Sequence, residues 1–120
     1  MGASILVVDD DDQIRAVLKR KLEQCHYDVC EAADGKAAIR ALETAPFDLV
    51  ITDIIMPHMD GIETVRFLRK HQPQVKVIAI SAPSNELYLE SAAGLGASRT
   101  FQKPLKLAEL ADAVETLLNE

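Results

Sequence analysis

A series of short apolar runs constrains the fold of this chain more than any other feature. The clearest runs lie at residues 4–8, 48–52 and 75–80, and weaker runs lie near 28–32 and 98–102. Their length and their β-branched content are typical of buried parallel strands. The runs therefore predict a sheet of five strands.

The segments between these runs carry apolar residues at helical spacing. The predicted stripes are Ile14, Val17, Leu18, Leu22 and Cys25; Ala38, Ile39 and Leu42; Ile62, Val65 and Leu68; and Leu107, Leu110, Ala111, Val114, Leu117 and Leu118. Asp11 is predicted to cap the first helix, and Asp12 to lie at its positive end. Strand and helix alternate five times, which predicts an α/β fold with a parallel sheet covered by helices on both faces.

Length and charge exclude several classes of protein. Residues 1–120 are predicted to form one domain, and 13 basic residues against 19 acidic ones give a net charge of −6. Such a charge argues against non-specific binding to nucleic acid or to an anionic membrane surface. No apolar stretch approaches the roughly 20 residues that span a bilayer, and the first residues lack a secretory signal, so the cytoplasm is the expected location.

The two cysteines do not have the spacing of a metal or redox motif. Cys25 and Cys30 form neither a CxxC motif nor part of a second pair. We interpret both as small core residues, which is the commoner role of a free cysteine.

Polar residues stand at the carboxyl ends of four apolar runs. Asp9 and Asp10, Asp53, Ser81 and Lys103 occupy these positions. Open α/β sheets build their ligand sites where the carboxyl ends of the strands meet. Neighbouring acids repel each other unless a cation lies among them, and Mg²⁺ prefers such oxygen ligands. A lysine that can bind phosphate completes a predicted phosphoryl-handling site.

These residues, in this order, resemble the receiver domain of two-component response regulators, the CheY-like family. The matching segments are Ile5–Asp11, Asp48–Gly61, Ile80–Ala82 and Lys103–Pro104, and the resemblance covers nearly all of the chain. It implies a doubly wound, flavodoxin-like (βα)5 fold with strand order 2-1-3-4-5.

The resemblance also implies a role for each site residue. Asp53 would accept the phosphoryl group, and Mg²⁺ would be held by Asp10 directly, by Asp9 through a water, by Asp53 and by the main-chain carbonyl of Ile55. Lys103, and Ser81 with the amide of Ala82, would bind the phosphoryl oxygens. The Lys103–Pro104 peptide would be cis, and Gly61 is interpreted as a position that permits a positive φ.

Three positions depart from the family pattern. Thr100 stands where the family usually has Tyr or Phe, and Phe101 should point to the opposite face of its strand. Ile55 and Pro83 occupy the positions that tune attack of water on the aspartyl phosphate in this family. Neither side chain can orient a water by hydrogen bonding, so a long-lived phosphate is predicted.

The leading hypothesis is a phosphorylation-dependent switch in two-component signalling. A histidine kinase or phosphotransfer protein would supply the phosphoryl group, and an output partner would bind the face of the fourth helix, fifth strand and fifth helix. The fourth helix carries Leu87, Tyr88, Leu89 and Leu95. No enzyme activity is expected beyond self-catalysed phosphotransfer and autodephosphorylation.

Two alternatives are a constitutive interaction module of the same fold and, more distantly, a haloacid-dehalogenase-type phosphatase. Thr100 and Pro83 favour the first of these. The phosphatase requires a DxDx motif followed by Thr or Val, whereas the acidic run here leads to Gln13.

Overall fold

The computed structural model describes residues 2–54, 61–82, 90, 93–94 and 96–120. The elements are β1 (Ser4–Val8), α1 (Asp12–Gln24), β2 (Asp28–Ala32), α2 (Gly35–Thr44), β3 (Leu49–Asp53), α3 (Gly61–His71), β4 (Lys76–Ser81), β5 (Arg99–Gln102) and α5 (Leu107–Leu118). The five strands form one parallel sheet of order β2-β1-β3-β4-β5. This confirms the predicted fold and strand order. The predicted helix with Leu87, Tyr88, Leu89 and Leu95 lies outside the described residues.

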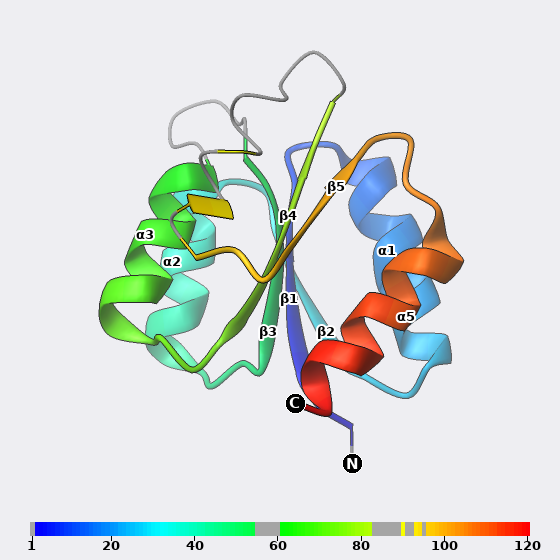
Figure 1. Cartoon of the computed structure of the whole chain (residues 1–120), viewed down its shortest axis with the longest axis horizontal. Coiled ribbons are helices and arrows are strands. Elements are labelled where there is room, and N and C mark those ends of the chain that lie inside the picture. The colour runs from blue at the N-terminus through cyan, green and yellow to red at the C-terminus, as the bar shows by residue number, and fades with distance from the viewer. Residues whose placement is uncertain (1, 55–60, 83–89, 91–92, 95) are drawn as a thin grey trace.

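Two helical layers enclose the sheet, with α2 and α3 on one face and α1 and α5 on the other (Figure 1). Strand β1 shows why its sequence is a continuous apolar run. Ile5 and Val7 pack into the core beneath α1 and α5, whereas Leu6 and Val8 pack beneath α2 and α3. Alternate side chains of one strand therefore fill both cores.

The register of the sheet brings the carboxyl ends of the central strands together. Val8 pairs with Thr52, Asp53 pairs with Ile80, and Ser81 pairs with Gln102. The residues that end these strands therefore lie along one edge of the sheet, as the sequence predicts.

Helix α1 begins and ends at identifiable signals. The Asp11 side chain accepts hydrogen bonds from the amides of Gln13 and Ile14, at 2.9 and 3.3 Å, which confirms the predicted cap. At the other end, His26 has a φ of 70°. The amide of Tyr27 donates to the carbonyl of Leu22 at 3.2 Å, and that of His26 to Glu23 at 2.9 Å. These bonds form a Schellman motif in which histidine occupies the place that usually holds glycine.

Two expectations about the core are wrong. Cys25 and Cys30 are both exposed, because Cys25 caps the end of α1 and Cys30 lies on the edge strand β2. Val17 is 49% exposed, because α1 buries the neighbouring Leu18 and Leu22 against the sheet and leaves Val17 on its flank. Within the described part of the chain, none of the helices has the length and apolarity needed to cross a bilayer.

Candidate functional site

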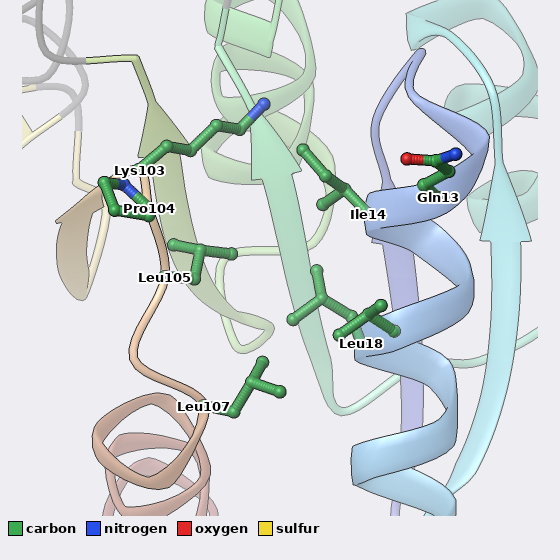
Figure 2. A pocket seen from close by; sticks show the side chains of 8 residues that line it. Gln13, Ile14, Leu18, Lys103, Pro104, Leu105 and Leu107 are labelled. Atoms are coloured by element: carbon green, nitrogen blue, oxygen red, sulfur yellow. The ribbon is translucent and has the colours of Figure 1, made fainter.

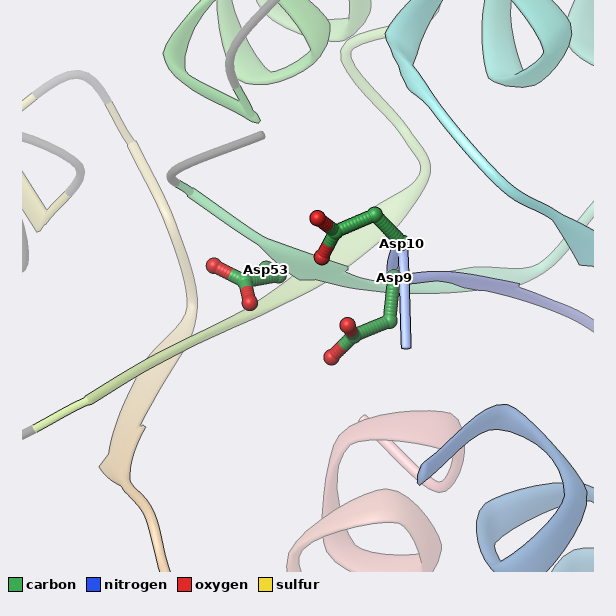
Figure 3. A group of neighbouring side chains, drawn as sticks. All are labelled: Asp9, Asp10 and Asp53. Atoms are coloured by element: carbon green, nitrogen blue, oxygen red, sulfur yellow. The ribbon is translucent and has the colours of Figure 1, made fainter. Parts of the chain in front are cut away.

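Three carboxylates gather at the carboxyl ends of β1 and β3 (Figure 3). One oxygen from each of Asp9, Asp10 and Asp53 lies within 4.8 Å of the others. Asp9 is fully buried and Asp53 is 6% exposed, whereas Asp10 is exposed to solvent. All the donor atoms are hard oxygens at a spacing that one divalent cation can bridge, so the cluster fits Mg²⁺.

Lys103 reaches this cluster from the end of β5. Its Nζ lies 2.7 Å from Oδ2 of Asp53 and 3.1 Å from Oδ2 of Asp9. Its amide donates to the carbonyl of Ser81 at 2.7 Å, which fixes the backbone of Lys103 beside β4. The Lys103–Pro104 peptide bond is cis, as the resemblance implies.

Burial and charge act in opposite directions on these groups. Burial raises the pKa of Asp9, although the amide of Asp11 and the ammonium of Lys103 partly oppose it. Burial also disfavours the charged form of Lys103, but the hydrogen bond and charge of Asp53, with those of Asp9, outweigh it and raise the pKa of Lys103. The lysine is therefore held in its charged form among the acids.

Ser81 ends β4 with a buried hydroxyl. Its Oγ has no hydrogen-bond partner among the residues that the structure describes. A buried hydroxyl loses hydrogen bonds to water, so an unpaired one is unfavourable unless a ligand oxygen takes their place. The backbone carbonyl of Ser81 accepts the amide of Lys103, so Ser81 adjoins the residue that reaches the carboxylates.

The loop after β3 is only partly within the described residues. The predicted carbonyl ligand of Ile55, the segment 56–60 and Pro83 lie outside them. Gly61 is described as the first residue of α3, whereas the turn before it lies outside the described residues. A close approach requires glycine at this position, because a Cβ there would lie 2.5 Å from the Cα of Ile54.

Thr100, which stands where the family usually has an aromatic residue, and its neighbour Phe101 lie on opposite faces of β5. Thr100 pairs with Ala79 and is exposed, whereas Phe101 pairs with Ile80 and packs against the core beneath α1 and α5. This confirms that Phe101 points away from the face of Thr100.

An open apolar groove of about 350 Å³ lies between α1 and the segment that joins β5 to α5 (Figure 2). It is lined by Gln13, Ile14, Val17, Leu18, Lys103, Pro104, Leu105 and Leu107. Lys103 therefore contacts the acidic cluster and also lines this groove, together with the exposed Val17.

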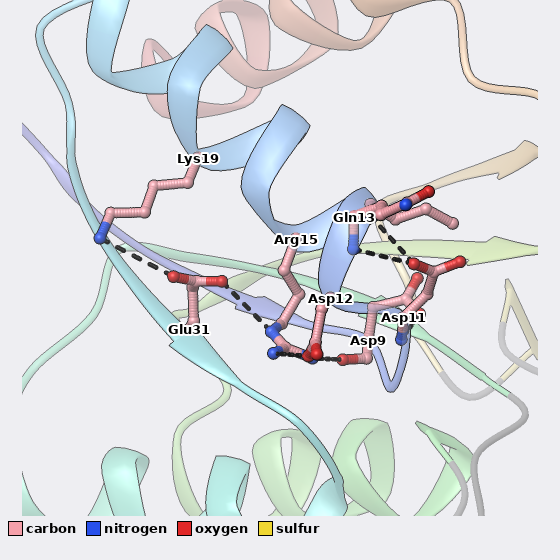
Figure 4. A network of polar contacts seen from close by, with 8 residues as sticks. Asp9, Asp11, Asp12, Gln13, Arg15, Lys19 and Glu31 are labelled. Atoms are coloured by element: carbon pink, nitrogen blue, oxygen red, sulfur yellow. Dashed lines mark hydrogen bonds and ion pairs between the residues drawn. The ribbon is translucent and has the colours of Figure 1, made fainter.

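The sequence gives no prediction for Arg15, yet its guanidinium contacts the acidic turn between β1 and α1. It donates to the main-chain carbonyl of Asp9 at 2.6 Å and also pairs with Asp12 and with Glu31 of β2 (Figure 4). The i, i+3 spacing of Asp12 and Arg15 is a signal for one of these contacts. The contact with Glu31 joins residues that are distant in sequence, and no local pattern indicates it.

Comparison with known proteins identifies the family. Residues 5–115 match the family model of the response regulator receiver domain. The chain belongs to this family. A receiver domain is not an enzyme in the usual sense of turning over a substrate, and the match does not favour a phosphatase.

Relatives of this receiver domain include response regulators from several bacteria. It is 32% identical to the response regulator receiver protein CpdR of Brucella abortus, over 95% of both chains. It is 34% identical to the alkaline phosphatase synthesis transcriptional regulatory protein PhoP of Bacillus subtilis, over 98% of this chain but 49% of that protein. The chain thus spans about half of that regulator's length.

A solved relative has the same architecture. The response regulator TrrA of Thermotoga maritima, in complex with Mg²⁺–BeF, superposes with a TM-score of 0.87 at 32% identity. The alignment covers 98% of this chain and 99% of that one. Receiver domains bind Mg²⁺ at an acidic site of the kind that Asp9, Asp10 and Asp53 form here.

Proposed function

We propose that Asp53 accepts a phosphoryl group in a Mg²⁺-dependent reaction and that the phosphorylated chain changes its affinity for an output partner. The observation that carries this proposal is the position of the Asp53 carboxylate. It is nearly buried, one of its oxygens lies within 4.8 Å of one oxygen each of Asp9 and Asp10, and its Oδ2 accepts a hydrogen bond from the ammonium of Lys103 at 2.7 Å.

In the proposed transfer, a carboxylate oxygen of Asp53 forms a bond to phosphorus while the phosphorus–nitrogen bond of a donor phosphohistidine breaks. The electron pair of that bond goes to the imidazole nitrogen. Asp10, Asp53 and the carbonyl of Ile55 would hold Mg²⁺ directly, and Asp9 would hold it through a water. The ion would supply positive charge that offsets charge on a phosphoryl oxygen.

Two side chains would stabilise the remaining phosphoryl charge. Lys103 is already charged and lies beside Asp53, so its ammonium can move from the carboxylate to a phosphoryl oxygen. The buried hydroxyl of Ser81, with the amide of Ala82, can donate to another oxygen once the group is present. The proposed acceptor would thus lie beside the proposed cation site and the ammonium of Lys103, with Ser81 at the end of the neighbouring strand.

We further propose that residues 1–120 act as one receiver domain in the cytoplasm, with a sensor histidine kinase or a phosphotransfer protein as the donor. The proposed output face includes β5 and α5. Since Thr100 supplies no aromatic ring there, the change at this face depends on Lys103, Ser81 and the segments that carry them.

Incubation with Mg²⁺ and acetyl phosphate, followed by intact-mass measurement, tests the acceptor assignment. The wild-type chain is expected to gain one phosphoryl group and to remain unlabelled when EDTA removes Mg²⁺. Asp53→Asn should abolish the label. Asp112→Asn, which makes the same change at an exposed position of α5, should leave it intact.

Labelling of Asp53→Asn at the wild-type level would contradict the acceptor assignment. Labelling that is unaffected by EDTA would contradict the cation requirement. Lys103→Met is expected to slow labelling by about tenfold or more, since one charged donor to the transition state is lost.

A further inference from the structure

We infer that Arg15 is a positioning residue for the metal-binding turn: it holds the peptide that joins Asp9 to Asp10 so that both carboxylates face Asp53. The inference rests on the proposed function, because it concerns the affinity of the same site for Mg²⁺. Arg15 itself contacts neither a proposed ligand oxygen nor Asp53 in the contacts that the structure describes.

Arg15 brings together three separate parts of the chain. Its guanidinium donates to the carbonyl of Asp9 at the end of β1, to the carboxylate of Asp12 in the first turn of α1, and to Glu31 of β2 at 3.2 Å. The Asp9 amide adds a bond to the carbonyl of Ala32, the last residue of β2, at 3.2 Å. The acidic turn is therefore fastened to β2 on both sides of Asp9, and Figure 4 shows the connection through Arg15.

The bond to the carbonyl of Asp9 has a direct geometric consequence. The peptide group is planar and includes the Cα atoms of both residues that it joins. A donor that fixes the carbonyl of Asp9 at 2.6 Å therefore fixes the plane between Asp9 and Asp10. The directions in which these two side chains leave the backbone are constrained with it.

Burial distinguishes this contact from an ordinary surface ion pair. The Arg15 side chain is 13% exposed, although its partner Asp12 is 88% exposed. An exposed pair contributes little by itself. The planar fork of arginine can satisfy several acceptors at fixed angles, whereas lysine is a single point charge on a flexible stem. The arrangement therefore requires arginine for its geometry rather than for its charge.

A purely electrostatic role predicts the opposite effect on the cation. A guanidinium close to the site repels Mg²⁺, so removal of its charge would tighten binding. Arg15→Lys keeps the charge and removes the fork, which separates the two effects. Lys19→Met is the matched control, because Lys19 pairs with the other oxygen of Glu31, at 3.8 Å, and lies one turn further along α1.

Titration of the metal-free protein with MgCl₂ by isothermal calorimetry measures the dissociation constant without any phosphoryl transfer. We expect Arg15→Lys to weaken Mg²⁺ binding by about tenfold, as for other residues that orient metal ligands. Lys19→Met is expected to stay within about twofold of wild type, as befits an exposed pair. The melting temperature of each variant is recorded in parallel.

An Arg15→Lys variant that melts lower but binds Mg²⁺ as wild type does would show a structural role only and would overturn the inference. Tighter binding would overturn it as well. Should Arg15→Lys fail to fold, Glu31→Gln replaces it as the test variant. Its affinity for Mg²⁺ is expected to lie below that of Lys19→Met and above about one tenth of the wild-type affinity. An unchanged affinity overturns the inference. A wild-type chain that binds no Mg²⁺ would refute the proposed function as well as this inference. If wild type binds Mg²⁺ and is labelled at Asp53, a contrary result for the Arg15 variant refutes only the inference about Arg15.

Discussion

Replacement of Gly61 by alanine is expected to destabilise the fold and to slow phosphorylation at Asp53. The added Cβ would lie 2.5 Å from the Cα of Ile54 and closer still to the carbonyl oxygen of Asp53. Both are backbone atoms at the end of β3, so neither can rotate out of the way. Helix α3 cannot withdraw either without losing the bond from the Gly61 amide to the Ile54 carbonyl, at 3.0 Å.

These contacts set the size of the effect. Overpacking against a rigid neighbour costs about 1 to 3 kcal/mol, and a weakened hydrogen bond adds about 1 kcal/mol. Alanine reduces the entropy of the unfolded chain and returns about 0.4 to 1 kcal/mol. The expected loss in the free energy of unfolding is therefore about 2 kcal/mol.

Urea unfolding followed by circular dichroism measures this loss, and the rate of labelling by acetyl phosphate measures its effect on the site. Gly94→Ala is the matched control, because a Cβ at Gly94 meets no atom of the described residues within 4 Å. The control should keep wild-type stability or exceed it slightly. A Gly61→Ala variant as stable as Gly94→Ala, and labelled as fast, would refute the reasoning.

Three further predictions concern charge, a helix end and the lifetime of the phosphate. Burial raises the pKa of Asp9, so the folded state loses stability as pH rises from the ordinary value of 3.8 through that raised pKa. Asp9→Asn should therefore raise the unfolding free energy of the metal-free protein at pH 7 and change it little below pH 3.8, measured by urea unfolding across pH. Mg²⁺ should stabilise wild type more than this variant; equal stabilisation, or a variant less stable at pH 7, would contradict the account. His26→Gly should raise the melting temperature, since it removes about 1 kcal/mol of left-handed backbone strain at the end of α1, and a lower melting temperature would count against this. Ile55→Asn should shorten the half-life of the Asp53 phosphate, because an amide can orient water whereas isoleucine cannot; a longer half-life in the variant, followed by intact mass, would disprove it.

Local signals in the sequence predicted the described strands and helices and the polar residues that end the strands. The alternation in β1 follows from burial on both faces of a parallel strand, and the cap at Asp11 follows from the needs of the first amides of a helix. Because parallel strands align their carboxyl ends, polar residues at the ends of the runs indicate the site before any contact is known. Asp53, Ser81 and Lys103 were predicted in this way, and the structure brings the side chains of Asp53 and Lys103 together with that of Asp9, while the backbone of Ser81 adjoins Lys103.

The sequence by itself predicted where strands and helices alternate along the chain and which polar residues end the strands, because periodicity and strand ends are local properties of the chain. The order of the strands in the sheet was implied only by the family resemblance. Only the tertiary structure decided that Gly61 must be small, that Cys25 and Cys30 lie outside the core, and that Arg15 reaches across to Glu31. Each of these depends on how closely two elements approach, and that distance is set by the packing of all the side chains between them.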